Sequence, residues 1–139
     1  MKGNIMLKKN TLLKATLSLG LVLGLGGTAV ANASSWTVSS VTVSSGGHWS
    51  TYGEKNLKET NSNVASFNGD SQPAKFGCMV HLINSHAETR SDTVWLYLNQ
   101  TTHAGNNSGT KNYYYADVRS HRYELSTTRV KLHFSSDRK

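Results

Sequence analysis

Positions 129–134 read Arg-Val-Lys-Leu-His-Phe, and this stretch is the strongest indication of fold class in the chain. Val130, Leu132 and Phe134 alternate strictly with residues that carry, or can carry, a positive charge. Successive side chains of a β-strand point to opposite faces, whereas an apolar helical face repeats about every 3.6 residues. We therefore predict a strand whose apolar side faces a core and whose basic side faces solvent.

The same period of two recurs upstream. The stretches are Trp36–Val43, Phe76–Ile83 and Val94–Leu98. In the first stretch the alternation changes phase at Ser39-Ser40, which predicts a β-bulge. In the other two, the side chains predicted to face the core are Phe76, Cys78, Val80 and Leu82, and then Val94, Leu96 and Leu98.

Turn-forming residues separate these stretches. Ser44–Gly47 and Gly105–Gly109 are typical of loops, and Asn84–His86 interrupts the chain before the Trp95 stretch. Asn68-Gly69-Asp70 predicts a hairpin turn that follows a strand over Val64–Phe67.

Two further elements complete the expected fold. Tyr113-Tyr114-Tyr115 favours a strand, because aromatic side chains fit a pleated surface. A short helix is expected over Glu54–Thr60. With six or seven short strands in about 100 residues, the chain is predicted to be all-β, a small antiparallel β-sandwich.

Residues 1–33 have the three parts of a secretory signal peptide. A head with Lys2, Lys8, Lys9 and Lys14 precedes an uncharged leucine-rich centre, which ends at Ala31-Asn32-Ala33. We predict cleavage after Ala33, which leaves Ser34 as the new N-terminus, with cleavage after Ala31 as the alternative. An uncleaved membrane anchor is the competing interpretation. The protein is thus expected outside the cell, either released or held at the envelope by non-covalent contacts.

Residues 34–139 are expected to form one domain, because 106 residues suit a single core. Cys78 is the only cysteine in the chain, so no intramolecular disulfide can form. It lies in the middle of an apolar strand, which predicts a buried, inert thiol with a raised pKa.

No catalytic or metal-binding pattern stands out. The six histidines lack the close spacing to further ligands that a zinc site needs, and His81 and His86 are five positions apart. The Gly-x-Ser-x-Gly nucleophile elbow is absent from the sequence. We predict no catalytic residue, no metal and no cofactor, and hence a protein that is not an enzyme.

Positive charge is concentrated in the last quarter of the chain. Residues 34–139 carry a net charge of +3, which divides into −1 for residues 34–110 and +4 for residues 111–139. The predicted binding residues are Arg119, Arg122, Arg129, Lys131 and His133. Such a face suits anionic envelope polymers or lipid head groups, whereas nucleic acid is not expected for an exported protein. The alternative is the solvated face of an edge strand.

From Lys75 onward the chain resembles a family of small secreted proteins of Gram-positive bacteria, catalogued as a domain of unknown function. The resemblance is carried by an apolar strand, Thr93–Leu96, a Gly/Asn-rich loop, Tyr113–Ala116 and Thr128–Leu132. It implies a signal-bearing secreted protein and no known activity. Ser45–Gly53 is also similar to the Gly/Trp/Tyr-rich start of sandwich-type lactococcin bacteriocins, although residues 111–139 do not follow that pattern.

These observations together predict an exported, non-catalytic binding protein that acts at or outside the cell envelope. Two alternatives stay open at this point. One is a bacteriocin-like antimicrobial protein, and the other is a small secreted hydrolase.

Overall fold

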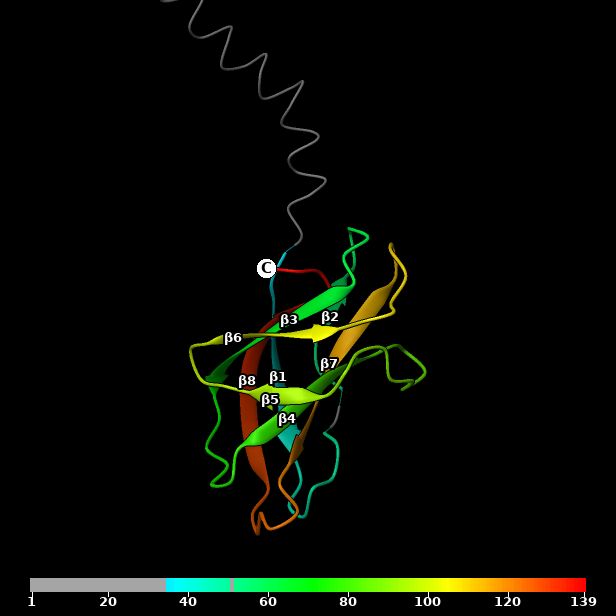
Figure 1. Ribbon diagram of the computed structural model, residues 1–139. Helices are drawn as coiled ribbons and strands as arrows, with labels where there is room; N and C mark the ends of the chain where they lie inside the picture. The colour runs from blue at the N-terminus through cyan, green and yellow to red at the C-terminus, as the bar shows by residue number, and fades with distance from the viewer. Residues whose placement is uncertain (1–34, 51) are drawn as a thin grey trace, which may run out of the picture. The chain divides into compact units, whose positions relative to one another are not determined.

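The computed structural model describes residues 35–50 and 52–139, which belong to one compact unit, Ser34–Lys139. Eight strands form two antiparallel sheets of four strands each (Figure 1). The strands are β1 (Thr37–Val43), β2 (Lys55–Leu57), β3 (Val64–Ser71), β4 (Cys78–Ile83), β5 (Val94–Leu96), β6 (Thr101–Gly105), β7 (Tyr113–Ser120) and β8 (Thr128–Ser135). The all-β antiparallel sandwich is confirmed, with eight strands rather than six or seven.

The first sheet has the strand order β1-β8-β3-β6, and the second has the order β2-β7-β4-β5. The chain crosses repeatedly between the sheets, so that strands adjacent in space are mostly distant in sequence. The alternative interpretation, that the basic stretch 129–134 lies on an edge strand, is wrong, because β8 pairs with β1 on one side and with β3 on the other.

The core lies between the two sheets and follows the alternation of the strands. Val130, Leu132 and Phe134 of β8 are fully buried, and the ring of Phe134 stacks 6.4 Å from that of Phe67 on β3. Cys78 is fully buried as predicted. Burial, and secondly the carboxylate of Glu124, raise the pKa of the Cys78 thiol to about 11.

The bulge predicted at Ser39-Ser40 is wrong. β1 pairs with β8 without a change of register, so Ser39 points inward and Val38 is exposed on the outer face. The inward hydroxyl is tolerated because its oxygen accepts the backbone N–H of Glu54 at 3.0 Å. A satisfied hydroxyl can occupy a core position that the apolar pattern alone assigns to a neighbour.

The hairpin turn predicted at Asn68-Gly69-Asp70 is also wrong, because these residues lie inside β3. The register of β3 against β8 shifts between Gly69 and Ser71, which is a β-bulge or similar irregularity at this position. The backbone of Gly69 donates to Tyr97 O and accepts from Asn99 N, each at 2.8 Å. A Cβ on Gly69 would lie 2.8 Å from that carbonyl oxygen. Here glycine permits the close approach of another backbone rather than a turn.

Two predicted core positions on strands are exposed. Phe76 is 44% exposed because it precedes β4, and Gly77 turns the chain there with a φ of +80°. Leu98 is 48% exposed because β5 ends at Leu96 and the chain then leaves toward the other sheet.

The helix predicted over Glu54–Thr60 is wrong. Residues Lys55–Leu57 form β2, and Lys58, directly after it, is only 1% exposed. Its ammonium lies 3.0 Å from a carboxylate oxygen of Asp137 and donates to the carbonyl oxygens of Ser62 and Ser136. All three donors of this buried ammonium therefore have acceptors, which burial of a charge requires.

The carboxylate of Asp137 also accepts several hydrogen bonds. It accepts the backbone N–H of Glu59 at 2.9 Å and the hydroxyl of Thr60 at 2.6 Å, besides the Lys58 ammonium. Burial acts to raise the pKa of Asp137, but the hydrogen bonds from Thr60 and Glu59 and the Lys58 charge outweigh it and leave that pKa lowered. This network fastens residues 58–62 to the segment that follows β8.

The predicted signal peptide, including the cleavage position between Ala33 and Ser34, lies outside the described residues. Within residues 35–50 and 52–139, no helix has the length and hydropathy needed to cross a bilayer.

Candidate functional site

Three strands of the second sheet place three side chains in a row on its outer face. β4 pairs with β5 so that Met79 lies opposite Trp95, and with β7 so that Met79 lies opposite Arg119. The neighbours of Met79 along β4, Cys78 and Val80, are fully buried, so the side chain of Met79 points outward. Trp95 is 42% exposed at the end of this row.

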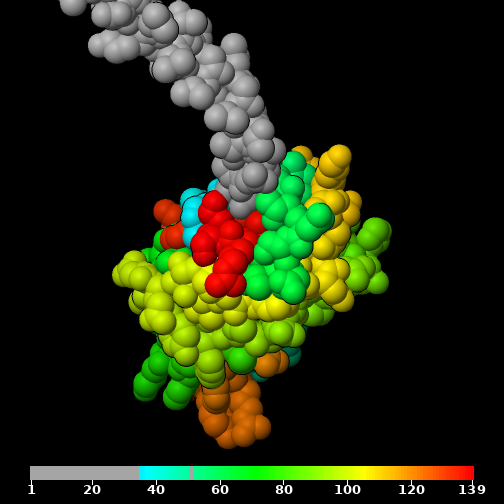
Figure 2. Space-filling model, turned by 45° about the horizontal axis from the view of Figure 1, so that its top comes forward, coloured from blue at the N-terminus to red at the C-terminus, as the bar shows by residue number. Residues whose placement is uncertain are grey.

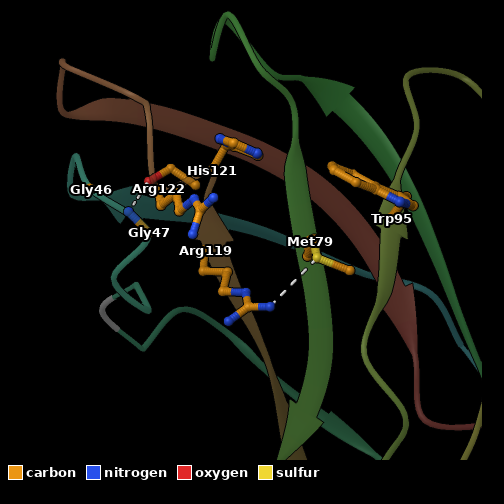
Figure 3. A pocket seen from close by; sticks show the side chains of 8 residues that line it. Gly46, Gly47, Met79, Trp95, Arg119, His121 and Arg122 are labelled. Atoms are coloured by element: carbon orange, nitrogen blue, oxygen red, sulfur yellow. Dashed lines mark hydrogen bonds between the residues drawn. The ribbon is translucent and has the colours of Figure 1, made fainter.

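This row forms part of a hollow of about 350 Å³, which we call the arginine groove (Figure 3). Its lining residues are Gly46, Gly47, Met79, Trp95, Arg119, Ser120, His121 and Arg122. Figure 3 shows Arg119, His121 and Arg122 on one side of Met79 and the Trp95 indole on the other. The groove thus combines two guanidinium groups, one imidazole, one thioether and one indole.

The contacts of the two guanidinium groups are uncharged. Arg119 lies 3.6 Å from the sulfur of Met79 and 5.0 Å from the ring centre of Trp49. Arg122 lies 4.8 Å from the ring centre of Tyr123 and donates to its hydroxyl at 2.9 Å. Among residues 35–50 and 52–139, neither arginine forms an ion pair with a carboxylate. Their charge is oriented but not neutralised.

The backbone beside these arginines is held by a turn that needs glycine. Gly46 and Gly47 have φ values of +79° and +83°, a region that side chains disfavour. The N–H of Gly47 donates to the hydroxyl oxygen of Ser120, and that hydroxyl donates to the carbonyl of Ser44. A Cβ on Gly47 would lie 3.2 Å from the Cα of Arg122. The turn therefore packs closely against the backbone that carries Arg122.

The rest of this outer face is covered by the segment around Trp49. The indole of Trp49 stacks on the imidazole of His81 with ring centres 3.9 Å apart, and Ser50 donates to Asp117 at 2.9 Å. His81 is 5% exposed, and its Nε2 lies 3.6 Å from an Asp117 oxygen. These contacts attach the segment to the sheet next to the arginine groove.

The structure separates the five predicted binding residues. Arg119 and Arg122 line the arginine groove, whereas Arg129, Lys131 and His133 lie on the outer face of the first sheet. The outward direction of the β8 side chains is as predicted, but the five residues do not form one face.

Two side chains of the β8 stripe already have partners on the first sheet. His133 Nδ1 lies 2.8 Å from a carboxylate oxygen of Asp70, and the edge of the His133 ring meets the Trp36 ring with centres 4.6 Å apart. Arg129 donates to the hydroxyl of Thr42 at 3.2 Å. The carboxylate of Asp70 thus lies beside the stripe at His133, whereas Arg129, like the arginines of the groove, contacts an uncharged group.

No group of three or more histidine, cysteine, aspartate or glutamate side chains in residues 35–50 and 52–139 is arranged to hold a metal ion. His81 is buried under Trp49, whereas His86 is exposed in the turn after β4.

Sequence reasoning missed Trp95 and Met79 as members of the site. The alternation of Val94 and Leu96 with Trp95 did place the indole outward, and Met79 was on the outer side of its strand. The strand order, which places β5 and β7 on either side of β4, could not be predicted from the sequence.

Comparison with protein-family models, with curated protein sequences and with solved structures gives no significant match. The function is therefore inferred from the residues and geometry of this molecule.

Proposed function

We propose that this chain is an exported, non-catalytic protein that binds anionic groups of the cell envelope through the arginine groove. The observation that carries this proposal is the pair of guanidinium groups, Arg119 and Arg122, which line one hollow without a carboxylate partner among the described residues. Phosphate and carboxylate oxygens are the preferred partners of guanidinium groups, which bind them through paired hydrogen bonds.

The other lining residues favour a ligand that also has an apolar surface. Trp95 presents a partly exposed indole, and Met79 lies between it and Arg119. An indole offers a large rigid contact area, and a thioether adapts to irregular shapes. A polymer that alternates charged groups with less polar units matches this combination better than a bare inorganic ion does.

The composition of the groove supports binding rather than turnover. None of its eight lining residues is an aspartate, a glutamate or a cysteine, whereas glycoside hydrolysis needs two facing carboxylates. The one hydroxyl among them, on Ser120, is buried and engaged with Gly47 and Ser44. The alternative of a small secreted hydrolase has no comparable residue set in this groove.

Retention on purified Gram-positive cell walls tests the proposal. The substitution pair Arg119→Gln plus Arg122→Gln should abolish most of the retention of residues 34–139 at low salt. The matched control is Arg129→Gln plus Lys131→Gln, which removes the same charge from the other sheet and should leave most of the retention. Binding of the parent should also weaken as salt rises, because screening shortens to about 8 Å at 0.15 M ionic strength.

Two results would contradict the proposal. If both double variants lose retention equally, the attraction is unspecific and the groove has no special role. If the groove variant is retained as well as the parent, the arginines are not the binding groups. Circular dichroism of each variant checks that the fold is intact.

The bacteriocin-like alternative predicts a different outcome. Purified protein would then inhibit the growth of neighbouring Gram-positive strains in a zone assay, whereas a binding protein without antimicrobial action would not.

A further inference from the structure

One end of the sandwich exposes apolar side chains, and we call it the hairpin end after its projecting loop, which connects β7 of one sheet to β8 of the other. It consists of residues 44–47, residues 74–76 and the β7–β8 connection, residues 121–127. Leu125 is 91% exposed, Tyr123 is 58% exposed and Phe76 is 44% exposed. In Figure 2 the β7–β8 connection (orange) projects from the body of the molecule at the bottom of the view.

The exposed rings at this end form a continuous series. The ring of Phe76 lies 5.5 Å from that of His121, which in turn lies 5.0 Å from that of Tyr123. The ammonium of Lys75 lies 5.8 Å from the ring centre of Phe76, and Arg122 lies over Tyr123. Aromatic surface and cations therefore alternate on the same loops.

The loops of the hairpin end are fastened together by Glu124. Its side chain is only 7% exposed and accepts the backbone N–H of Phe76 at 3.3 Å. Its carbonyl oxygen accepts the N–H of Gly46 at 2.9 Å, and its own N–H donates to His121 O. The apolar tips are thus held in place before any partner arrives, which reduces the ordering cost of binding.

The exposed charge of the hairpin end is positive. Glu124 is the only acidic residue in its three segments, and it is buried. Lys75 and Arg122 are exposed there, and Arg129 follows at the start of β8. This end therefore complements a negatively charged partner, and it offers that partner apolar tips as well.

We propose that the hairpin end docks onto an anionic lipid bilayer, with Leu125 and Tyr123 entering the interfacial region. Tyrosine is enriched at membrane interfaces, and apolar side chains beside cations are typical of proteins that lie on anionic lipids. Each lysine or arginine near such a surface strengthens binding about fivefold. A projecting tip with few apolar residues suits a fluid interface better than the flat patch of a protein partner.

This docking surface adjoins the arginine groove and shares Gly46, Gly47, His121 and Arg122 with it, but its exposed tips, Tyr123 and Leu125, lie outside the groove and meet a different ligand. It goes beyond the proposed function, because contact with a bilayer would place the groove beside the envelope polymers that it is proposed to bind.

Vesicle binding tests the inference. Purified residues 34–139, which form one compact unit, are sedimented with vesicles of phosphatidylcholine and phosphatidylglycerol in equal amounts, and with vesicles of phosphatidylcholine alone. The parent should bind the anionic vesicles, and binding to the neutral vesicles should be weaker by about tenfold or more. The variant Tyr123→Ser plus Leu125→Ser should lose at least about tenfold in partitioning, because Leu125 alone contributes about that factor when buried.

Tyr113 offers a matched control at the opposite end of β7. It is 48% exposed and has the ammonium of Lys55 4.3 Å from its ring centre, as Tyr123 has Arg122. Tyr113→Ser should therefore leave vesicle binding within about twofold of the parent, as exposed sites away from the contact usually do.

The outcomes separate this inference from the proposed function. Leu125→Ser alone keeps both groove arginines and the Tyr123 side chain that contacts Arg122, so its retention on cell walls should equal that of the parent while its vesicle binding falls. The inference is overturned if the parent binds neither kind of vesicle, which would point to a protein partner for the apolar tips. It is also overturned if the variant Tyr123→Ser plus Leu125→Ser binds anionic vesicles like the parent. Absence of wall retention in the parent would refute the groove proposal alone.

Discussion

Replacing Lys58 tests the most unusual feature of the fold, a lysine buried in a small sandwich. Lys58→Met keeps much of the side-chain volume but removes the ammonium that bonds Asp137 and the carbonyl oxygens of Ser62 and Ser136. The carboxylate of Asp137, which is 1% exposed, then stays buried without its counter-charge. Removing one partner of a buried pair costs about 3–5 kcal/mol.

That cost should be measurable by heat or urea. For a domain of this size, 1 kcal/mol shifts the melting temperature by about 4–8 °C, so a loss of at least about 12 °C is expected. Tryptophan fluorescence during urea unfolding gives the free energy directly. Lys55→Met is the matched control, because Lys55 is exposed three positions earlier and should cost no more than about 0.5 kcal/mol.

The pair can also be tested for coupling. Lys58→Met combined with Asp137→Asn removes both charges, so the double variant should lose less stability than the sum of the single variants. The reasoning is refuted if Lys58→Met costs under about 1 kcal/mol, or if the two single losses simply add. Either result would mean that Lys58 and Asp137 do not depend on each other in the folded protein.

The lowered pKa of Asp137 gives the pair a defined dependence on pH. In the unfolded chain this carboxyl titrates near its usual value of about 3.9, whereas in the folded protein it keeps its charge to a lower pH. The unfolded state therefore binds the proton first as the pH falls. The stabilisation is complete above about pH 4 and is lost as the pH falls through the folded pKa, so the parent should approach Asp137→Asn in stability there.

Three further predictions concern two other closely packed positions and the predicted signal peptide. A thiol reagent at neutral pH should label Cys78 slowly in native protein and fast in urea, because the thiol is buried and burial raises its pKa to about 11; rapid native labelling would place Cys78 at the surface. Gly69→Ala should destabilise the fold by about 1–3 kcal/mol in urea titrations, since its Cβ would lie 2.8 Å from Tyr97 O, and an unchanged midpoint would contradict that close approach. N-terminal sequencing of protein from culture medium should begin at Ser34 or Asn32, and recovery of full-length chain from the membrane fraction alone would exclude cleavage.

The arginine groove and the hairpin end share residues of the connection between β7 and β8. Arg119 and Ser120 end β7, His121 and Arg122 begin the turn, and the exposed Leu125 lies at its far side. A protein that rests on a bilayer through that turn would hold the groove close to the membrane surface. The two proposals thus describe one orientation at the envelope, although separate variants test them.

The kind of secondary-structure element and its apolar side can be predicted from the residue pattern for several strands. Strict alternation in β8 correctly predicted that Val130, Leu132 and Phe134 are buried and that the basic side chains point outward. It also placed Cys78 in the core. These inferences hold because the direction of a strand side chain depends only on local backbone geometry.

Secondary-structure predictions from local residue types were wrong where a segment distant in sequence contacts the residue. Asn68-Gly69-Asp70 has the composition of a turn, yet Gly69 lies in β3 because the backbone near Tyr97 passes against it. Residues 54–60 were predicted to form a helix, yet residues 55–57 form β2. Lys58 is buried after this strand because Asp137, close to the C-terminus, supplies its counter-charge. Neither partner can be identified from the residues around the position itself.

Which basic residues share a surface depends on how the strands pair and pack. Arg119 and Arg129 are ten positions apart but lie on opposite sheets, whereas Trp95 and Arg119, more than twice as far apart in sequence, flank Met79 on one face. Strand order and register come from the simultaneous packing of both sheets around one core, and that packing is a property of the whole chain. A binding site built across three strands is therefore visible only once those strands are paired.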